Sequence, residues 1–352
     1  MQREKIVSIN GLRGFACLII MLYHFRFYLL DKGVELIDYG HYFVEVFIMV
    51  SGFLMAYNYS SIIADMNFRA FWSKRYMKIM PLYWITEICV YIAEILATVL
   101  SGEKYEWNLS QTLWELSGFY TGWFGQADVP VNNPLWTVCC LFLCYALYFA
   151  ICKVRKKSDT LYISMIIVII ISCFYYVNHT GSNYLFGSED SLRCIISFMF
   201  GLLLYELYKK LTMKQGMIIS YILIGIFVGS IVGLSYYQMI SRIDMDNVVS
   251  KIVIFLFGPI MLYSAIYIKG LKFLFSSRIM QFIGKISMDI YMWHWVVRIY
   301  LGSRPFYVNQ NTWSGWALLI TVSLVVAVLS HYIVMPWVYG MGVKIKRGIG
   351  KI

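Results

Sequence analysis

Two histidines and one glutamate lie in apolar stretches of the sequence, where ionisable side chains are rare. These residues are His24, Glu45 and His294. Placing a charged side chain in the middle of a membrane costs roughly 2.5–3.5 kcal/mol, so each of them calls for a role. An imidazole can act as a base at neutral pH, and a neighbouring carboxylate can orient it. We therefore hypothesise that His24 is a general base whose tautomer is held by Glu45.

The apolar stretch that contains His24 also contains Arg13. Eleven helical positions at 100° each return to within about 20° of the start, so both side chains lie on one face. At 1.5 Å per residue they are about 16 Å apart along the helix axis. Arg13 is therefore expected near one membrane boundary and His24 in the opposite half of the bilayer.

A basic segment, FRAFWSKRYMKIMPLYW (68–84), places Arg75 and Lys78 three positions apart. On a helix these two residues share a face, which suits the binding of phosphate groups. The alternative interpretation is topological, because basic residues gather at the cytoplasmic ends of membrane helices whatever the function.

The composition predicts an integral membrane protein. Hydrophobic residues make up 60% of the 352 residues and charged residues only 14%, whereas soluble chains carry about 25% charged residues. The net charge of +11 does not indicate nucleic-acid binding, because the basic residues cluster in short segments between apolar runs. The eight cysteines lie within or beside apolar runs, so we expect neither a disulfide framework nor a metal site.

The predicted fold is an all-α membrane bundle of about ten transmembrane helices, forming a single domain over residues 1–352. Lys and Arg concentrate in every second connection between apolar runs. By the positive-inside rule this pattern predicts that both termini are cytoplasmic. The first run is too long for a cleaved signal peptide and is expected to be retained. The expected spans lie near 11–30, 40–58, 81–100, 134–152, 160–178, 192–208, 217–237, 250–268, 283–301 and 314–336.

The longest predicted external connection, residues 101–133, is rich in aromatic side chains. Aromatic residues of this kind gather at the headgroup region of a bilayer. Two interpretations stay open, an ordinary interfacial belt or a lid over the acceptor. The aromatic residues concerned are Trp107, Trp114, Phe119, Tyr120, Trp123 and Phe124.

Four separate stretches resemble the bacterial acyltransferase type 3 membrane proteins, a family that O-acylates glycans and related acceptors. The opening helix is similar to the family's Arg-x10-His helix, and the second ends on Ser51-Gly-Phe-Leu. The basic segment resembles an Arg-x-x-Arg stretch, and a late helix resembles a Ser…Tyr-x-x-His pattern. In this chain the stretches read INGLRGFACLIIMLYHF (9–25), FVEVFIMVSGFLM (43–55), FWSKRYMKIMPLYW (71–84) and IGKISMDIYMWHW (283–295).

The resemblance implies an enzyme of the bacterial cytoplasmic membrane with acyl-coenzyme A as co-substrate and no bound cofactor. The acyl group, acetyl by family default, would pass to a hydroxyl of a cell-surface or exported glycan. The donor would be bound by Arg13, Arg75, Lys78 and Ser51. The acceptor would lie beside Tyr291, Trp293, His294 and Trp295, although His294 could instead be a structural histidine bonded between helices.

The chain departs from the family pattern at four places. Glu45 stands where Asp is common, and Lys78 replaces the second Arg. Leu141 and Phe142 occupy positions where two acidic residues are expected, and Val334-Met335 replaces a Glu before the last proline. These departures indicate either a subgroup with another acceptor or a chain without activity. Two further classes stay open, a transporter or flippase for a lipid-linked glycan and a non-catalytic scaffold.

Overall fold

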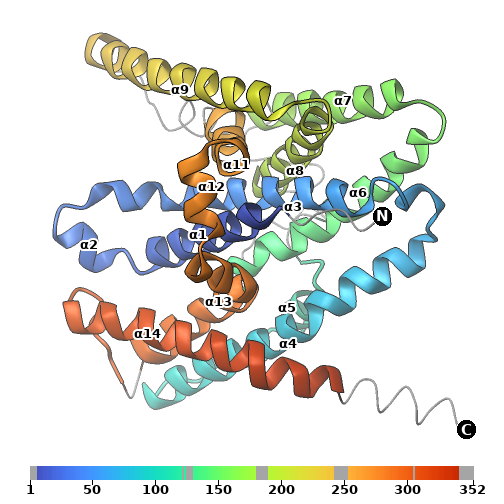
Figure 1. The fold of residues 1–352 in the computed structure, drawn as a ribbon. Coiled ribbons are helices and arrows are strands. Elements are labelled where there is room, and N and C mark those ends of the chain that lie inside the picture. Colours follow the sequence, from blue (N-terminus) through green and yellow to red (C-terminus); the bar gives the residue numbers. More distant parts are fainter. Residues whose placement is uncertain are drawn as a thin grey trace, which may run out of the picture.

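The computed structural model describes residues 6–120, 123, 130–179, 189–241, 253–303 and 306–340, and within these ranges the regular elements are helices (Figure 1). The α-helices are α1 (Val7–His24), α2 (Phe27–Asp31), α3 (Phe43–Tyr59), α4 (Phe68–Leu100), α5 (Leu109–Ser117), α6 (Trp136–Arg155), α7 (Asp159–His179), α8 (Glu189–Tyr208), α9 (Met213–Ser241), α11 (Gly258–Tyr267), α12 (Lys269–Ser276), α13 (Arg278–Gly302) and α14 (Trp313–Leu329). Short 3₁₀ helices are η1 (Glu35–Tyr42), η2 (Ile63–Asp65) and η3 (Asn133–Leu135), and π-helical turns are η4 (Val253–Phe257) and η5 (Ser330–Val334).

The helices α1 and α13 run parallel through the centre of the bundle at unusually close range. A Cβ atom on Gly14 would lie 2.5 Å from the backbone nitrogen of Gly284, and one on Gly284 would lie 2.1 Å from the carbonyl oxygen of Asn10. Only glycine permits this approach. The contact fixes the longitudinal register of the two helices, because the glycines interlock at one level.

A second pair of parallel helices, α3 and α8, is packed in the same way. A Cβ atom on Gly52 would lie 2.2 Å from the carbonyl oxygen of Phe198, and one on Gly201 would lie 2.1 Å from that of Met49. The resulting core is continuous, whereas α7 and α9 lie along one side of it and α14 along the opposite side (Figure 1). We call the end of the bundle where α1 ends the His24 end, and the opposite end, where α4 begins, the Arg75 end.

Eight helices in the described part of the chain are long and apolar enough to span a membrane, against about ten expected. The segment expected at 250–268 contributes only the shorter apolar helix 255–267 to this comparison, and residues 250–252 lie outside the described ranges. Helix α13 is 25 residues long but is not among these eight. The number of crossings and the cytoplasmic placement of both termini stay predictions.

The sequence predicted a basic connection followed by a span that begins near residue 81. In the structure, residues 68–84 are instead the beginning of α4. Asn67 caps this helix by accepting a 2.8 Å hydrogen bond from the backbone N–H of Arg69. The helix then continues for 33 residues through Pro81. Arg75 and Lys78 therefore stand on the same rigid rod as the residues at its far end.

The described part of the segment after α4 turns back along α4, and the choice between an interfacial belt and a lid over the acceptor stays open. Trp107 stacks on Tyr91 with ring centroids 6.1 Å apart, and Phe119 stacks on Trp72 at 6.2 Å. Between them, Ser117 accepts a hydrogen bond from Tyr76 through its carbonyl. At 1.5 Å per residue, positions 91 and 72 of α4 are about 28 Å apart, so the segment descends through most of a bilayer. Phe124 lies outside the described residues.

Candidate functional site

The two histidines singled out in the sequence lie side by side at the His24 end. Their ring centroids are 5.1 Å apart. Each follows its helix's contact glycine by ten residues, Gly14 in α1 and Gly284 in α13. Since the helices are parallel and the glycines interlock, equal spacing brings the two imidazoles to the same height, about 15 Å above the glycine contact. The register of one helix pair thus builds the site.

The surroundings of His294 fix which of its nitrogens carries the proton. Its Nδ1 lies 3.1 Å from the carbonyl oxygen of Ile290, and a carbonyl can only accept. Nδ1 is therefore the donor, which leaves Nε2 of the neutral ring as an acceptor. That atom is fully buried and has no hydrogen-bond partner in the described part of the chain. The ring of Trp295 completes the site, with its centroid 5.2 Å from that of His24.

Glu45 lies in a different arrangement from the one hypothesised. Its carboxylate forms an ion pair and a hydrogen bond with Arg193 on α8, and Arg193 also contacts Asp190 at 3.3 Å. The other oxygen of Glu45 is buried without a hydrogen-bond partner among the described residues. The bonds of Glu45 therefore join α3 to α8 at the His24 end. No described bond joins this carboxylate to His24.

Arg13 joins α1 to α13 at the level of the glycine contact. Its guanidinium donates to the Gly284 carbonyl at 2.6 Å, to the Ser287 hydroxyl at 3.0 Å and to the Asn10 side chain at 3.2 Å. Much of its donor capacity is therefore used inside the protein. It still lies within electrostatic range of Lys78, so the expected donor-binding cations do converge.

Arg75 and Lys78 occupy the Arg75 end of the site. The Arg75 guanidinium lies 4.3 Å from the ring centroid of Tyr59, and its Nε has no hydrogen-bond partner in the described structure. Lys78 is exposed. Ser51 donates to the carbonyl of Phe47 one turn earlier on α3, at 2.9 Å. Of the expected donor-binding residues, Arg75 and Lys78 thus keep free donor groups.

The late-helix residues Tyr291 and Trp295 are held by residues 131–137, which we call the 131–137 segment. Tyr291 donates to the Pro134 carbonyl at 2.9 Å, and Trp295 donates to the Val131 carbonyl at 3.1 Å. Asn132 adds a bond to the Met292 carbonyl at 3.2 Å. These bonds immobilise the face of α13 that carries His294.

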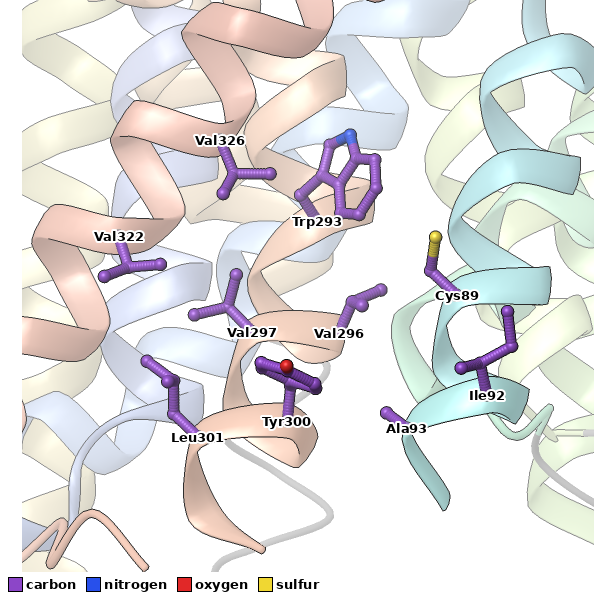
Figure 2. Close-up of a pocket in the computed structure, with 10 residues that line it drawn as sticks. All are labelled: Cys89, Ile92, Ala93, Trp293, Val296, Val297, Tyr300, Leu301, Val322 and Val326. Carbon is purple, nitrogen blue, oxygen red and sulfur yellow. The ribbon is translucent and has the colours of Figure 1, made fainter. Parts of the chain in front are cut away.

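Trp293 points elsewhere, into an apolar pocket of about 360 Å³ between α4, α13 and α14 (Figure 2). Successive helical residues diverge by 100°, so Trp293 and His294 face different sides of α13. The pocket that Trp293 lines therefore opens on a different side of α13 from the one that carries His294. Its lining residues are Cys89, Ile92, Ala93, Trp293, Val296, Val297, Tyr300, Leu301, Val322 and Val326.

Several residues of the site region were not predicted, because their partners are distant in sequence. Arg193 meets Glu45 across 148 positions. Asp289 accepts hydrogen bonds from Ser330 at 2.7 Å and from His331 at 2.9 Å, across the π-helical turn η5. A local pattern gives no sign of such pairs. The only available signal was that each is an ionisable residue in an apolar run.

The sequence profile of the acyltransferase 3 family, described as an acyltransferase domain, matches residues 6–332. This match includes both histidines, both glycine contacts and the basic start of α4. The chain belongs to this acyltransferase family. Among family features, the structure brings the histidine of the opening helix into contact with that of the late helix, and the arginine of the opening helix into hydrogen bonding with Ser287 of the late helix.

Among relatives of the chain, one Staphylococcus aureus (strain COL) protein is named "Putative O-acetyltransferase". It is 22% identical over 361 residues, which cover 93% of this chain and 56% of the relative. The "O-acetyltransferase OatA" of Staphylococcus aureus (strain NCTC 8325 / PS 47) is 21% identical over 345 residues, covering 86% of this chain and 52% of the relative. The chain thus spans about half the length of these curated relatives. Comparison with solved structures gives no match.

The departure from the family pattern in α6 has a structural counterpart. Phe142, at one of the positions where acids were expected, is buried against Tyr76 and Trp72, with ring centroids 5.4 and 5.9 Å away. Phe119 of the descending segment belongs to the same cluster. Acidic side chains at this place would be surrounded by aromatic rings, so the apolar residues and the packing of the segment belong together.

Proposed function

We propose that this chain is a membrane O-acyltransferase that moves an acetyl group from acetyl-coenzyme A to a hydroxyl of a cell-surface glycan. The observation that carries the proposal is the pair formed by His24 and His294, with a buried acceptor nitrogen on a ring of fixed tautomer. Membership of an acyltransferase family and relatives named O-acetyltransferases support the reaction class. We place the His24 end outside and the Arg75 end in the cytoplasm, as the distribution of basic residues predicts.

In the proposed reaction His24 is the general base. It takes the proton of the acceptor hydroxyl as the oxygen attacks the thioester carbonyl carbon. The new C–O bond forms, the C–S bond breaks, and the thiolate of coenzyme A leaves with the proton that His24 returns. His294 lies against His24 and offers Nε2 as an acceptor. This acceptor stabilises the His24 imidazolium that exists between the two proton transfers.

The donor's phosphates are assigned to the Arg75 end. Arg75 and Lys78 supply free donor groups there, while Arg13 adds positive charge and holds α1 against α13. The separation of about 16 Å between Arg13 and His24 along α1 suits a donor whose phosphates and thioester are far apart. The acyl carbonyl would then reach the histidines while the charged end of the donor stays at the membrane boundary.

The first test is acetyl transfer by purified protein in nanodiscs with radiolabelled acetyl-coenzyme A and cell-surface glycan extract. Replacing His24→Ala removes the base, so acceptor-dependent release of coenzyme A should fall by about 10²–10⁴-fold. His179→Ala is the matched control, because His179 is exposed at the end of α7. Its hydrogen bond in the described structure goes to the Tyr175 carbonyl of the same helix.

Two results would contradict the proposal. One is a folded wild-type protein that releases no coenzyme A with any short-chain donor. The other is a His24→Ala variant that transfers as fast as wild type. Either result would favour a transporter or a scaffold over an enzyme.

A further inference from the structure

Two arginines that the proposed mechanism does not use lie at the His24 end, beside the histidine pair. Arg26 follows α1, and Arg298 lies in the last turns of α13. Both guanidinium groups pack on the ring of Phe27, with distances to its centroid of 5.7 and 5.2 Å. Both also lie within electrostatic range of His24. Three groups that carry or can acquire positive charge are therefore gathered in one place.

The two arginines differ in how their charge is balanced. Arg26 forms an ion pair with Asp38 at 2.6 Å. Arg298 has no carboxylate partner in the part of the chain that the structure describes, although its side chain is partly buried. Like charges at short range in a poorly screened site repel each other. Among the residues that the structure describes, this arrangement lacks one negative charge, and a guanidinium is shaped to bind a phosphate or carboxylate through two parallel hydrogen bonds.

The position of Arg298 relative to His24 is fixed by one ring. The Arg298 guanidinium lies 4.6 Å from the ring centroid of Trp295, and the His24 ring lies 5.2 Å from the same centroid. The bond from Trp295 to the Val131 carbonyl prevents the indole from turning. The Arg298 guanidinium and the His24 ring therefore lie no farther apart than these two contact distances together, a span that one sugar unit can cover.

We propose that the acceptor is anionic, and that Arg298, assisted by Arg26, binds a phosphate or carboxylate on the sugar that is acylated or on its neighbour. This inference rests on the proposed function, because it names the class of acceptor for the same site. The anion orients the acceptor so that its hydroxyl meets His24. It also offsets the positive charge that the imidazole acquires when it takes the proton.

The test compares two acceptors with the same free hydroxyls, methyl α-glucoside and α-glucose 1-phosphate, in nanodiscs of neutral phosphatidylcholine. For wild type the KM of the phosphorylated sugar should be lower by roughly tenfold or more, as expected for a charge-assisted contact. Arg298→Gln should remove this preference, and Arg298→Lys should restore part of it. Lys32→Gln is the control for charge alone, because Lys32 lies near the same end but is paired with Asp31 at 3.6 Å.

A binding experiment separates failure of this inference from failure of the proposed function. Binding of radiolabelled pyrophosphate is measured with excess coenzyme A present, which fills the phosphate site at the Arg75 end. Saturable binding that Arg298→Gln weakens roughly tenfold, and Lys32→Gln leaves unchanged, supports the anion site whether or not acetyl transfer occurs. The anion-site inference is overturned if wild type shows no saturable binding, or if both variants lose binding equally. Acetyl transfer tests the proposed function independently.

A lipid headgroup has the same chemistry as a glycan phosphate and is the competing source of the anion. Nanodiscs containing phosphatidylglycerol distinguish the two. If phosphatidylglycerol abolishes the preference for the phosphorylated sugar and also displaces pyrophosphate from Arg298, the arginine binds lipid and the acceptor inference is wrong. If both are unchanged, the anion belongs to the acceptor.

Discussion

His24 and His294 differ in how firmly their surroundings hold them. The Ile290 carbonyl fixes the tautomer of His294, whereas His24 is placed by ring contacts with His294 and Trp295. The carboxylate hypothesised to orient His24 is bonded to Arg193 instead. At the scale of single residues, Glu45 and His24 therefore belong to different parts of the structure. Glu45 joins α3 to α8, and His24 lies against His294 and Trp295.

Glu45→Ala should destabilise the protein, by less than the about 3–5 kcal/mol expected for a buried charge left without a partner, because Arg193, with 21% of its side chain exposed, keeps its contact with Asp190 at 3.3 Å. The double variant Glu45→Met/Arg193→Met should recover most of this loss, since apolar side chains of similar size replace both charges. Thermal unfolding in detergent measures both effects. If the double variant is stable yet inactive in acetyl transfer, Glu45 takes part in catalysis beyond its ion pair.

At the scale of elements, the glycine contact between α1 and α13 decides whether the histidines meet. Gly284→Ala places a methyl group 2.1 Å from the Asn10 carbonyl oxygen, so the helices must separate or slide. We expect a loss of about 1–3 kcal/mol in stability and, because a displacement near 1 Å disrupts the reacting geometry, a fall of about 10²-fold in acetyl transfer.

The matched control for this substitution is Gly225→Ala in α9, where an added Cβ meets nothing within 4 Å. Acetyl transfer and thermal unfolding of both variants are measured side by side. Equal behaviour of the two alanine variants would show that close contact of α1 and α13 does not position the histidines.

At the scale of the whole molecule, the described part of the segment after α4 runs back along α4 with one side exposed. A cysteine at Trp107, whose side chain is 55% exposed, should react with a membrane-impermeant thiol reagent added outside cells. A cysteine at Phe119, which packs on Trp72 and Trp123, should be protected. The native cysteines of unaltered protein give the background. Labelling of Phe119→Cys at the rate of Trp107→Cys would contradict the descending path.

The sequence alone was sufficient to predict what depends on local pattern. Apolar runs predicted helices, and single ionisable residues within them marked His24 and His294. Contacts between distant segments were not predictable, because Gly14 and Gly284 are unremarkable glycines until two helices are placed together. The aromatic residues of 101–133 left two interpretations open for a related reason. Aromatic rings suit the headgroup region and a packed helix–segment interface equally well, and their composition does not distinguish the two.

The descending segment also separates two tasks that one stretch of chain could have combined. The α1–α13 contact brings the two histidines together, while the described residues among 101–137 bond α13 through the Val131 and Pro134 carbonyls and through the Asn132 and Thr137 side chains. A hydrogen bond accepted by a backbone carbonyl does not depend on the side chain of the residue that supplies this carbonyl. Substitutions in this stretch that spare Asn132 and Thr137 are therefore expected to leave the histidines in place. A chain built in this way can acquire a new acceptor through substitutions in one connection while its chemistry is inherited unchanged.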